Sequence, residues 1–202
     1  TSGLDIEIGT IIRTLVAHAT HQGKFDYVNS ISQEKLEDAW MKTQKSLTFA
    51  IDFTKSELGI TSTQLLSSPF MLTTLAYWIH NRNYQVAQSE QKMMRRWGLL
   101  ANGKGRYSRG STQELLSQDL AVIRDGGAAN ELLERLRQQV GRLEIELADF
   151  VARNARSGLF KNMFLVFAAD GARDWDSQLP ISPNHMGKAN RLQFHHIFPK
   201  KY

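Results

Sequence analysis

The stretch "PFMLTTLAYWIH", residues 69–80, is the most informative segment for the fold. It predicts a helix, because Pro69 stands at the start of an apolar run and proline is favoured in the first helical turn. The preceding segment, "ITSTQLLSSP", collects small polar residues and predicts a break with one short apolar turn. The following segment, "YQVAQSEQKMMRRWGLL", predicts a second helix with one apolar side. Its other side is largely basic and carries Lys92, Arg95 and Arg96.

Helical periodicity extends from there toward the N-terminus. Apolar residues three and four positions apart predict one apolar helix face, made of Ile8, Ile12, Leu15, Val16 and Ala19. Ser32 is a typical N-cap for a helix that begins with "QEKLEDAW" and whose apolar positions continue toward Leu58. Gly59 is expected to end this helix, so most of the N-terminal half is predicted to be helical.

The second half of the chain alternates glycine-containing breaks with helices. "ANGKGRYSRGS" predicts a glycine-rich loop, after which Ser111 or Thr112 caps the helix "QELLSQDLAVI". An apolar seam over residues 132–151 predicts a longer helical region, which Gly141 bends or divides. No heptad run and no internal repeat accompanies these helices.

A change of composition and periodicity marks the C-terminal part. Residues 170–185, "DGARDWDSQLPISPNH", collect Gly, Pro, Asp and Ser and predict a linker. Beyond them, Leu192 and Phe194 alternate with their neighbours at the period of a β-strand. We therefore expect a mainly α protein, divided into a multi-helix domain (1–172), a linker (173–190) and a short C-terminal β element (191–202).

The charge is concentrated in two basic segments. The formal net charge is +5, yet residues 81–110 carry seven Lys or Arg against one acid, and residues 184–202 carry four against none. These segments sum to +6 and +4, so the rest of the chain carries −5. Two basic segments on an acidic body favour binding to a polyanion such as nucleic acid. Surface charge that only aids solubility is the alternative interpretation.

The sequence contains no stretch of the ~20 apolar residues that span a bilayer. "LFKNMFLVFAA", residues 159–169, comes nearest, but Lys161 and Asn162 interrupt it, and we expect a buried core helix. We therefore expect no membrane partner. The chain has no cysteine, which excludes disulfides and thiolate metal sites and fits a cytoplasmic protein. Metal ligands in such a chain are imidazole nitrogens or oxygens.

One apparent motif is excluded. Residues 98–105, "GLLANGKG", have the spacing of a phosphate-binding loop. That loop needs Ser or Thr after its lysine, and it must connect a strand to a helix. Here Gly105 follows Lys104, and the element before it is predicted to be a helix. The segment is therefore not expected to bind a nucleotide.

The last twelve residues, "RLQFHHIFPKKY", place two neighbouring histidines after the expected strand. Pro199 has no N–H to donate and helps to end the strand, so His195 and His196 are expected at a strand-to-loop corner. One neutral imidazole can bind a divalent metal while the other accepts a proton from water, as metal-assisted phosphodiester hydrolysis requires. Lys200 and Lys201 are expected to hold neighbouring phosphates. A structural role for both histidines is the alternative.

The string "FHHIFPKKY" resembles the opening strand and loop of the HNH nuclease motif, the ββα-metal site. More narrowly, it is similar to the version in GmrSD-type modification-dependent restriction endonucleases. The resemblance extends upstream through "FTKSELGITSTQLLSSPFMLTTLAYWI" and "RRWGLLANGKGRYSRGSTQELLSQDL" and covers most of the chain from around Phe53. Proteins of that family combine an N-terminal ParB/sulfiredoxin-like NTPase half, a helical region and a C-terminal HNH half. The resemblance implies that the β element begins a truncated HNH motif.

The resemblance implies His195 as a ligand of a divalent metal (Mg, Mn or Zn) and His196 as the general base. The basic segments add the residues expected to contact nucleic acid, namely Lys200, Lys201, Arg106, Tyr107, Arg95, Arg96, Lys104 and Arg109. Among them, Arg106 is expected to contact a phosphate and Tyr107 to stack. An internal salt bridge from Arg106 to Asp119 is the alternative.

The family pattern includes parts that this chain lacks. The Asp-Gly-Gln-Gln-Arg type motif of the NTPase half is not present, so a nucleoside triphosphate is expected only through that half. We expect a fragment, inactive alone, of a metal-dependent HNH endonuclease that hydrolyses phosphodiester bonds of modified or foreign DNA. Its expected partners are DNA, the NTPase half and the rest of the HNH domain. The rival hypothesis is a non-catalytic helical DNA-binding or protein-interaction module, and a third is a family member that has lost activity.

Overall fold

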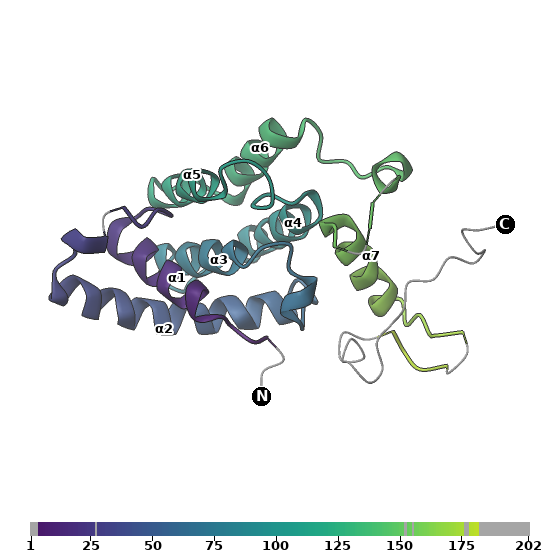
Figure 1. The fold of residues 1–202 in the computed structure, drawn as a ribbon, viewed down its shortest axis with the longest axis horizontal. Helices are drawn as coiled ribbons and strands as arrows, with labels where there is room; N and C mark the ends of the chain where they lie inside the picture. The colour runs from purple at the N-terminus through teal and green to yellow at the C-terminus, as the bar shows by residue number, and fades with distance from the viewer. Residues whose placement is uncertain (1–3, 27, 152, 155, 176–177, 182–202) are drawn as a thin grey trace.

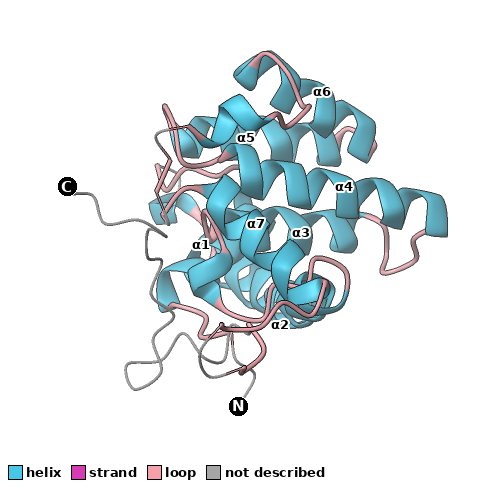
Figure 2. Cartoon of the chain, turned by 90° about the vertical axis from the view of Figure 1, so that its right-hand side faces the viewer, coloured by secondary structure: helices cyan, strands magenta, loops and turns pink. Residues whose placement is uncertain are grey.

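Seven α-helices and three short 3-10 turns make up the described part of the chain (Figure 1). The computed structural model describes residues 4–26, 28–151, 153–154, 156–175 and 178–181. In chain order the elements are α1 (Ile8–Thr20), η1 (Val28–Ser30), α2 (Gln33–Ser56), η2 (Thr63–Leu65), α3 (Phe70–Asn81), α4 (Gln88–Lys104), α5 (Thr112–Arg124), α6 (Ala129–Val140), η3 (Leu147–Phe150) and α7 (Gly158–Ala169). β pairing in these residues is limited to one isolated bridge, Arg173 with Pro180, and Figure 2 draws no strand. The mainly helical fold is confirmed, whereas the expected β element lies outside the described residues.

α3 is the central helix, with α1 and α2 on one side and α4 and α5 on the other (Figure 1). Every residue from Met71 to Ile79 is buried, because the helix is largely apolar and has neighbours all round. Pro69 is its N-cap, one residue before the first helical turn in which the sequence placed it. Trp78 is fully buried, and its indole Nε1 donates to Glu90 Oε1 at 3.0 Å. Truncating one such large core side chain costs ~2–5 kcal/mol, so α3 anchors the other helices.

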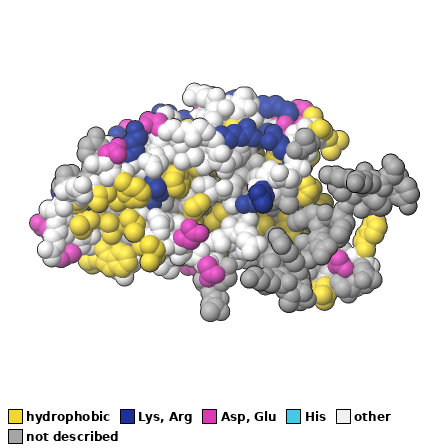
Figure 3. Space-filling model, viewed as in Figure 1, with side chains coloured by type: hydrophobic (Ala, Val, Ile, Leu, Met, Phe, Trp, Pro, Cys, Tyr) yellow, Lys and Arg dark blue, Asp and Glu magenta, His cyan; other side chains and the backbone are white. Residues whose placement is uncertain are grey.

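The apolar face predicted for α1 is partly wrong. Val16 is buried, but Ile8 and Ile12 are 75% and 48% exposed. The buried side of α1 consists of Thr10, Thr14, Val16, Ala17 and His18. Small side chains on this face let α1 approach α3 closely, and the hydroxyls of Thr14 and Thr73 hydrogen-bond at 3.0 Å. The larger apolar residues therefore remain at the surface, where Figure 3 shows hydrophobic side chains over α1 and the first half of α2.

Helix boundaries follow local capping, with one shift in the glycine-rich segment. Ser32 caps α2 as predicted, because its Oγ accepts from the backbone N–H of Lys35. α4 extends through residues 101–104, which were expected to be part of a loop, and Gly105 then ends it. The φ of Gly105 is +71°, a left-handed conformation that favours glycine. The segment with phosphate-loop spacing is thus helical, in agreement with its exclusion as a nucleotide site.

α6 is shorter than predicted, and α7 is less buried than predicted. α6 ends where Gly141 takes a φ of +84°, so the expected seam does not continue and Leu147 is 91% exposed. α7 was expected to be a buried core helix, but it buries only Leu159 and Phe164, and Val166 is 56% exposed. Among the described elements, α7 packs mainly on α4, η2 and η3, and it lies at one end of the other helices (Figure 1). None of the described helices has both the length and the hydropathy to cross a membrane.

Candidate nucleic-acid interface

The predicted functional residues fall into three groups. His195, His196, Lys200 and Lys201 lie outside the described residues. Arg106 and Tyr107 are buried inside the helical domain, whereas Arg95, Arg96, Lys104 and Arg109 lie at or near its surface. In the part of the chain that the structure describes, no group of three or more His, Cys, Asp or Glu side chains is placed to hold a metal ion.

Arg106 and Tyr107 point into the protein and share one carboxylate. The Arg106 guanidinium donates through Nε and Nη2 to the two oxygens of Asp119, at 3.0 and 2.8 Å. The Tyr107 hydroxyl donates to Asp119 Oδ2 at 2.6 Å. Arg106 is 1% exposed, Tyr107 3% and Asp119 0%. Of the two interpretations of Arg106, the internal salt bridge is therefore the one formed, and neither side chain reaches the surface where a nucleic acid would bind.

This buried network fixes the loop that follows α4. Arg106 Nη1 donates to Gln139 Oε1 at 2.8 Å, and Gln139 Nε2 donates to the backbone oxygen of Arg106 at 3.0 Å. Burial, and after it the nearby charge of Asp119, raises the pKa of Tyr107 well above its usual value, so this hydroxyl remains a neutral donor. Because α5 and α6 hold the loop from inside, the exposed residue that follows, Arg109, has a fixed starting point at the surface.

The basic side of α4 borders a large cavity, which we call the α4 hollow. Its volume is about 550 Å³, and its lining consists of Lys92, Arg95, Arg96, Leu99, Leu100, Leu143, Glu144 and Ile145. Lys92, Arg95 and Arg96 are exposed, and none of them is paired with an acidic side chain among the described residues. Three cations and one carboxylate, that of Glu144, thus line the hollow beside an apolar wall, and the excess of positive charge favours an anionic ligand.

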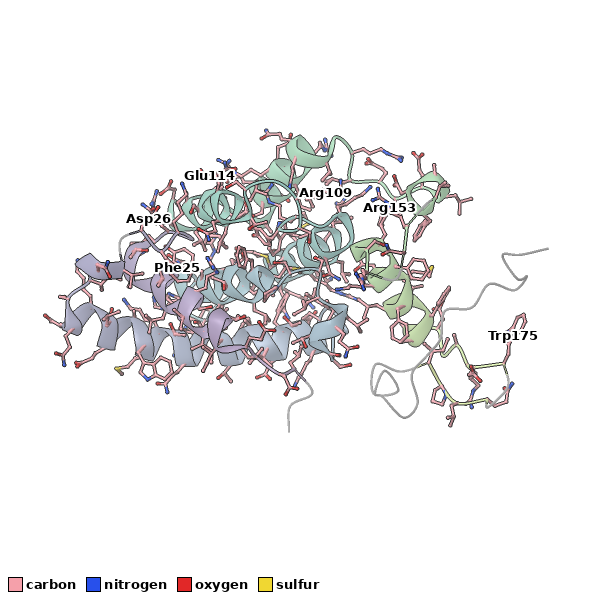
Figure 4. All side chains as sticks on the ribbon, in the orientation of Figure 1. Phe25, Asp26, Arg109, Glu114, Arg153 and Trp175 are labelled. Carbon is pink, nitrogen blue, oxygen red and sulfur yellow. The ribbon has the colours of Figure 1, made fainter. Side chains whose placement is uncertain are left out.

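A second and smaller cavity, the α4–α7 hollow, lies between the end of α4, the loop after it and the start of α7. Its volume is about 200 Å³, and no acidic residue lines it. The lining consists of Ser67, Gly103, Lys104, Gly105, Ser108, Arg109, Arg153, Arg156, Ser157, Gly158 and Leu159. Figure 4 labels Arg109 and Arg153, which reach this region from separate segments, and Figure 3 shows Lys and Arg side chains gathered over the same half of the molecule.

The α4–α7 hollow forms because α7 begins directly against the end of α4. A Cβ at Gly158 would lie 2.0 Å from the backbone oxygen of Asn102, so this approach requires glycine. The buried Asn102 side chain holds the contact: Nδ2 donates to Asn162 Oδ1 at 2.9 Å, and Oδ1 accepts from the Ser67 N–H at 2.6 Å. Ser157 caps α7. Local capping and one close helix contact thus bring distant basic residues together.

Lys104 is paired within the protein, but the arginines of the α4–α7 hollow are not. Lys104 Nζ lies 3.3 Å from Asp149 Oδ2. Arg109, Arg153 and Arg156 are exposed, and none forms an ion pair with an acidic side chain that the structure describes. Arg153 Nε donates only to the backbone oxygen of Asp149, at 3.2 Å. Three guanidinium groups without a counter-charge make the hollow suited to phosphate oxygens.

Sequence reasoning identified Lys104 and Arg109 but missed Arg153 and Arg156. Both missed arginines stand just before Ser157, which caps α7. Two basic residues next to a helix start are a weak pattern alone, because surface charge is the usual explanation. Their contribution to a binding site becomes evident only in the structure, because α7 packs on α4, which is distant in the sequence.

A separate polar cluster lies among α1, α2 and α3. His18 Nε2 hydrogen-bonds Ser46 Oγ at 2.9 Å and lies edge-on to the ring of His80, with centroids 4.9 Å apart. His21 Nδ1 hydrogen-bonds the Tyr77 hydroxyl at 2.7 Å. Burial, and after it the nearby His80, lowers the pKa of His18 to about 3, and burial also lowers the pKa values of His21 and His80. The imidazoles are neutral at pH 7, and they stabilise helix packing.

Comparison of the chain with models of protein families, with curated proteins and with solved structures finds no match. The resemblance to GmrSD-type endonucleases therefore stays a prediction from the residues quoted above. The function is inferred from side-chain chemistry and from the two basic hollows.

Proposed function

We propose that this chain contacts DNA through its helical domain and belongs to a metal-dependent HNH endonuclease of the GmrSD type. The proposed reaction is hydrolysis of phosphodiester bonds in modified or foreign DNA. The observation that carries the DNA contact is the set of unpaired cations in the two hollows: Lys92, Arg95, Arg96, Arg109, Arg153 and Arg156. The endonuclease assignment is supported by the string "FHHIFPKKY" at residues 194–202.

Unpaired cations in hollows are suited to the DNA backbone. Contacts from Lys and Arg to phosphates release counterions and supply affinity that does not depend on base sequence. A guanidinium group also donates two parallel hydrogen bonds to phosphate oxygens, which fixes the direction of the backbone. In the α4 hollow, Leu99, Leu100 and Ile145 add an apolar wall that suits a sugar next to a contacted phosphate. Arg106 and Tyr107 contribute indirectly, by fixing the loop that carries Arg109.

The proposed catalytic groups are the imidazoles of His195 and His196. His195 binds the divalent metal, and His196 accepts a proton from the attacking water, because a neutral imidazole can do either near neutral pH. The metal, when bound, neutralises charge on the phosphate and on the leaving oxygen. Lys200 and Lys201 hold the neighbouring phosphates. The proposed partners within the same protein are the NTPase half and the rest of the HNH domain. A nucleoside triphosphate is expected to bind only to the NTPase half.

Fluorescence anisotropy with a short labelled duplex tests the proposed interface. Replacing Arg95 and Arg96 with Gln is expected to weaken binding about tenfold at moderate salt, because two phosphate contacts are lost. A matched control replaces Arg124 and Arg137, two exposed arginines that pair with acidic neighbours and lie outside both hollows. The control is expected to change the affinity less than about twofold. An equal loss of affinity in both variants would show that only the net charge of the protein matters, and it would contradict the proposed interface.

Cleavage by the intact protein separates the endonuclease from its non-catalytic rival. His196→Ala is expected to abolish metal-dependent cleavage and leave the dissociation constant for DNA unchanged, because the imidazole acts on water and not on the backbone. A wild-type cleavage rate in this variant would contradict the assignment of His196 as the general base. An intact protein that binds DNA and never cleaves it would favour the non-catalytic DNA-binding module.

A further inference from the structure

We propose that the α4–α7 hollow binds a terminal phosphate, the phosphomonoester at the end of a DNA strand, and not an internal phosphodiester. The inference rests on the proposed DNA contact and names the part of the DNA that this hollow takes. It begins from three guanidinium groups, those of Arg109, Arg153 and Arg156, placed around one small cavity without an acidic partner in the described residues.

The number of donors matches a monoester better than a diester. An internal phosphodiester presents two free oxygens and one negative charge. A terminal phosphate presents three free oxygens and carries about −1.5 to −2 charge at pH 7. Each guanidinium group donates hydrogen bonds in a planar fork, so three of them can engage three oxygens. Ser108 Oγ lies at the edge of the hollow, but its one O–H is donated to the backbone oxygen of Ser67 at 3.1 Å, so the guanidinium groups supply the donors.

The size of the α4–α7 hollow also favours a chain end. Its volume is about 200 Å³, against about 550 Å³ for the α4 hollow. Its walls come from the end of α4, the loop that carries Arg109, the segment from Arg153 into the first turn of α7, and Ser67 before α3. An internal phosphate needs room for a nucleotide on each side, whereas a terminal phosphate needs it on one side only. The larger α4 hollow is the place for the continuing backbone.

The lining supplies polar groups that lack partners. The N–H groups of Gly158 and Leu159 belong to the first turn of α7, where backbone donors have no intrahelical acceptor and anions are favoured. The end of α4 carries the opposite partial charge to the start of α7, so the arginines decide the sign of the potential.

Two duplexes of identical sequence test the proposal, one with 5′-phosphate ends and one with 5′-hydroxyl ends, each labelled internally and titrated by anisotropy at fixed salt. The phosphorylated duplex is expected to bind about tenfold more tightly, the effect of one additional charge-assisted contact. In R153Q/R156Q the two duplexes are expected to bind equally. The matched variant R95Q/R96Q, in the α4 hollow, is expected to weaken both duplexes and keep their ratio.

The outcomes separate this inference from the proposed function. Equal wild-type affinity for the two duplexes, or a preference that survives R153Q/R156Q, overturns the terminal-phosphate site and leaves the DNA contact standing. No binding to either duplex overturns the proposed DNA contact itself. Inorganic phosphate at constant ionic strength is expected to remove the preference without displacing the 5′-hydroxyl duplex. Because Arg153 and Arg156 are exposed, the variant is expected to unfold at the wild-type temperature, and R109Q repeats the test if it does not.

Discussion

Arg106 and Arg109 stand three residues apart in one loop and end in opposite environments. Arg106 is 1% exposed and donates to both oxygens of Asp119. Arg109 is exposed and borders the α4–α7 hollow, where no acidic residue faces it. The same contrast distinguishes the two regions to which these arginines belong, the buried network around Asp119 and the α4–α7 hollow. An arginine whose counter-charge comes from the protein holds the fold, whereas one without a counter-charge is available to a ligand.

Solvent explains why the two environments differ. Removing Arg106 and Asp119 from water costs several kcal/mol for each ion, and only good geometry with additional hydrogen bonds offsets that cost. Tyr107 and Gln139 supply those hydrogen bonds. Arg109 keeps its hydration and loses little by having no partner in the protein. It can therefore exchange water for the oxygens of an anionic ligand.

The largest expected effect comes from breaking the buried network. Asp119→Ala leaves the Arg106 charge buried without a partner, and the free energy of unfolding is expected to fall by about 3–5 kcal/mol. Urea denaturation measures this loss. The matched control is Asp125→Ala, whose carboxylate pairs with Arg124 at the surface and whose loss is expected to have no measurable effect. Similar unfolding midpoints for the two variants would contradict the structural role of the network.

Acid is expected to weaken the helical bundle through His18. The pKa of His18 is about 3 in the folded chain, against the ordinary 6.5 when unfolded. Between these values the unfolded chain binds a proton that the folded chain does not, so the stability is complete above pH 6.5 and declines as the pH falls toward 3. The expected loss is about 2–4 kcal/mol.

Unfolding in urea at pH 7, 5.5 and 4 measures the contribution of His18. His18→Asn, which removes the titrating group, is expected to show a shallower decline between pH 6.5 and 4 than the wild type. Parallel curves for the two proteins would assign the acid sensitivity to other groups and leave His18 with a packing role alone.

A smaller effect is expected where α7 meets α4. Gly158→Ala places a Cβ 2.0 Å from the backbone oxygen of Asn102, so the helices must separate, at a cost of about 1–3 kcal/mol. The control is Gly9→Ala in α1, where a Cβ meets nothing within 4 Å and the helix gains up to about 1 kcal/mol. Thermal unfolding compares them. Two variants of equal stability would mean that α7 does not pack on α4 as described, and the α4–α7 hollow would lose one wall.

Local patterns predicted much of the fold. The Ser32 cap and the helix after Pro69 follow from one stretch of sequence each, because capping and turn geometry depend on near neighbours. Burial depends on distant elements, and those predictions were less accurate. Ile8 was placed on a packing face of α1, but close contact with α3 selected small residues instead. α7 is apolar enough for a core, yet among the described elements it packs mainly on α4, and Phe167 is 43% exposed.

The candidate site divides in the same way. Arg95 and Arg96 were found because they lie together on the basic side of one predicted helix. Arg153 and Arg156 were missed because they join Arg109 only when α7 packs on α4. The internal pair of Arg106 with Asp119 was one of two open interpretations, since spacing alone does not say which way a side chain turns. The roles predicted for the histidines at 195 and 196 stay predictions.

The salt dependence of DNA binding tests the central claim most directly. The slope of log K against log salt counts the phosphates that the protein neutralises, at roughly 0.9 for each contact with duplex DNA. For the triple variant R109Q/R153Q/R156Q, with a 5′-phosphorylated duplex, the slope is expected to be shallower than that of the wild type by roughly one unit, because the three arginines hold one terminal phosphate. The unfolding temperature is expected to stay close to that of the wild type, because these arginines are exposed and the hydrogen bond from Arg153 to the backbone oxygen of Asp149 lies at the surface. A slope identical to that of the wild type would show that the unpaired arginines do not contact DNA.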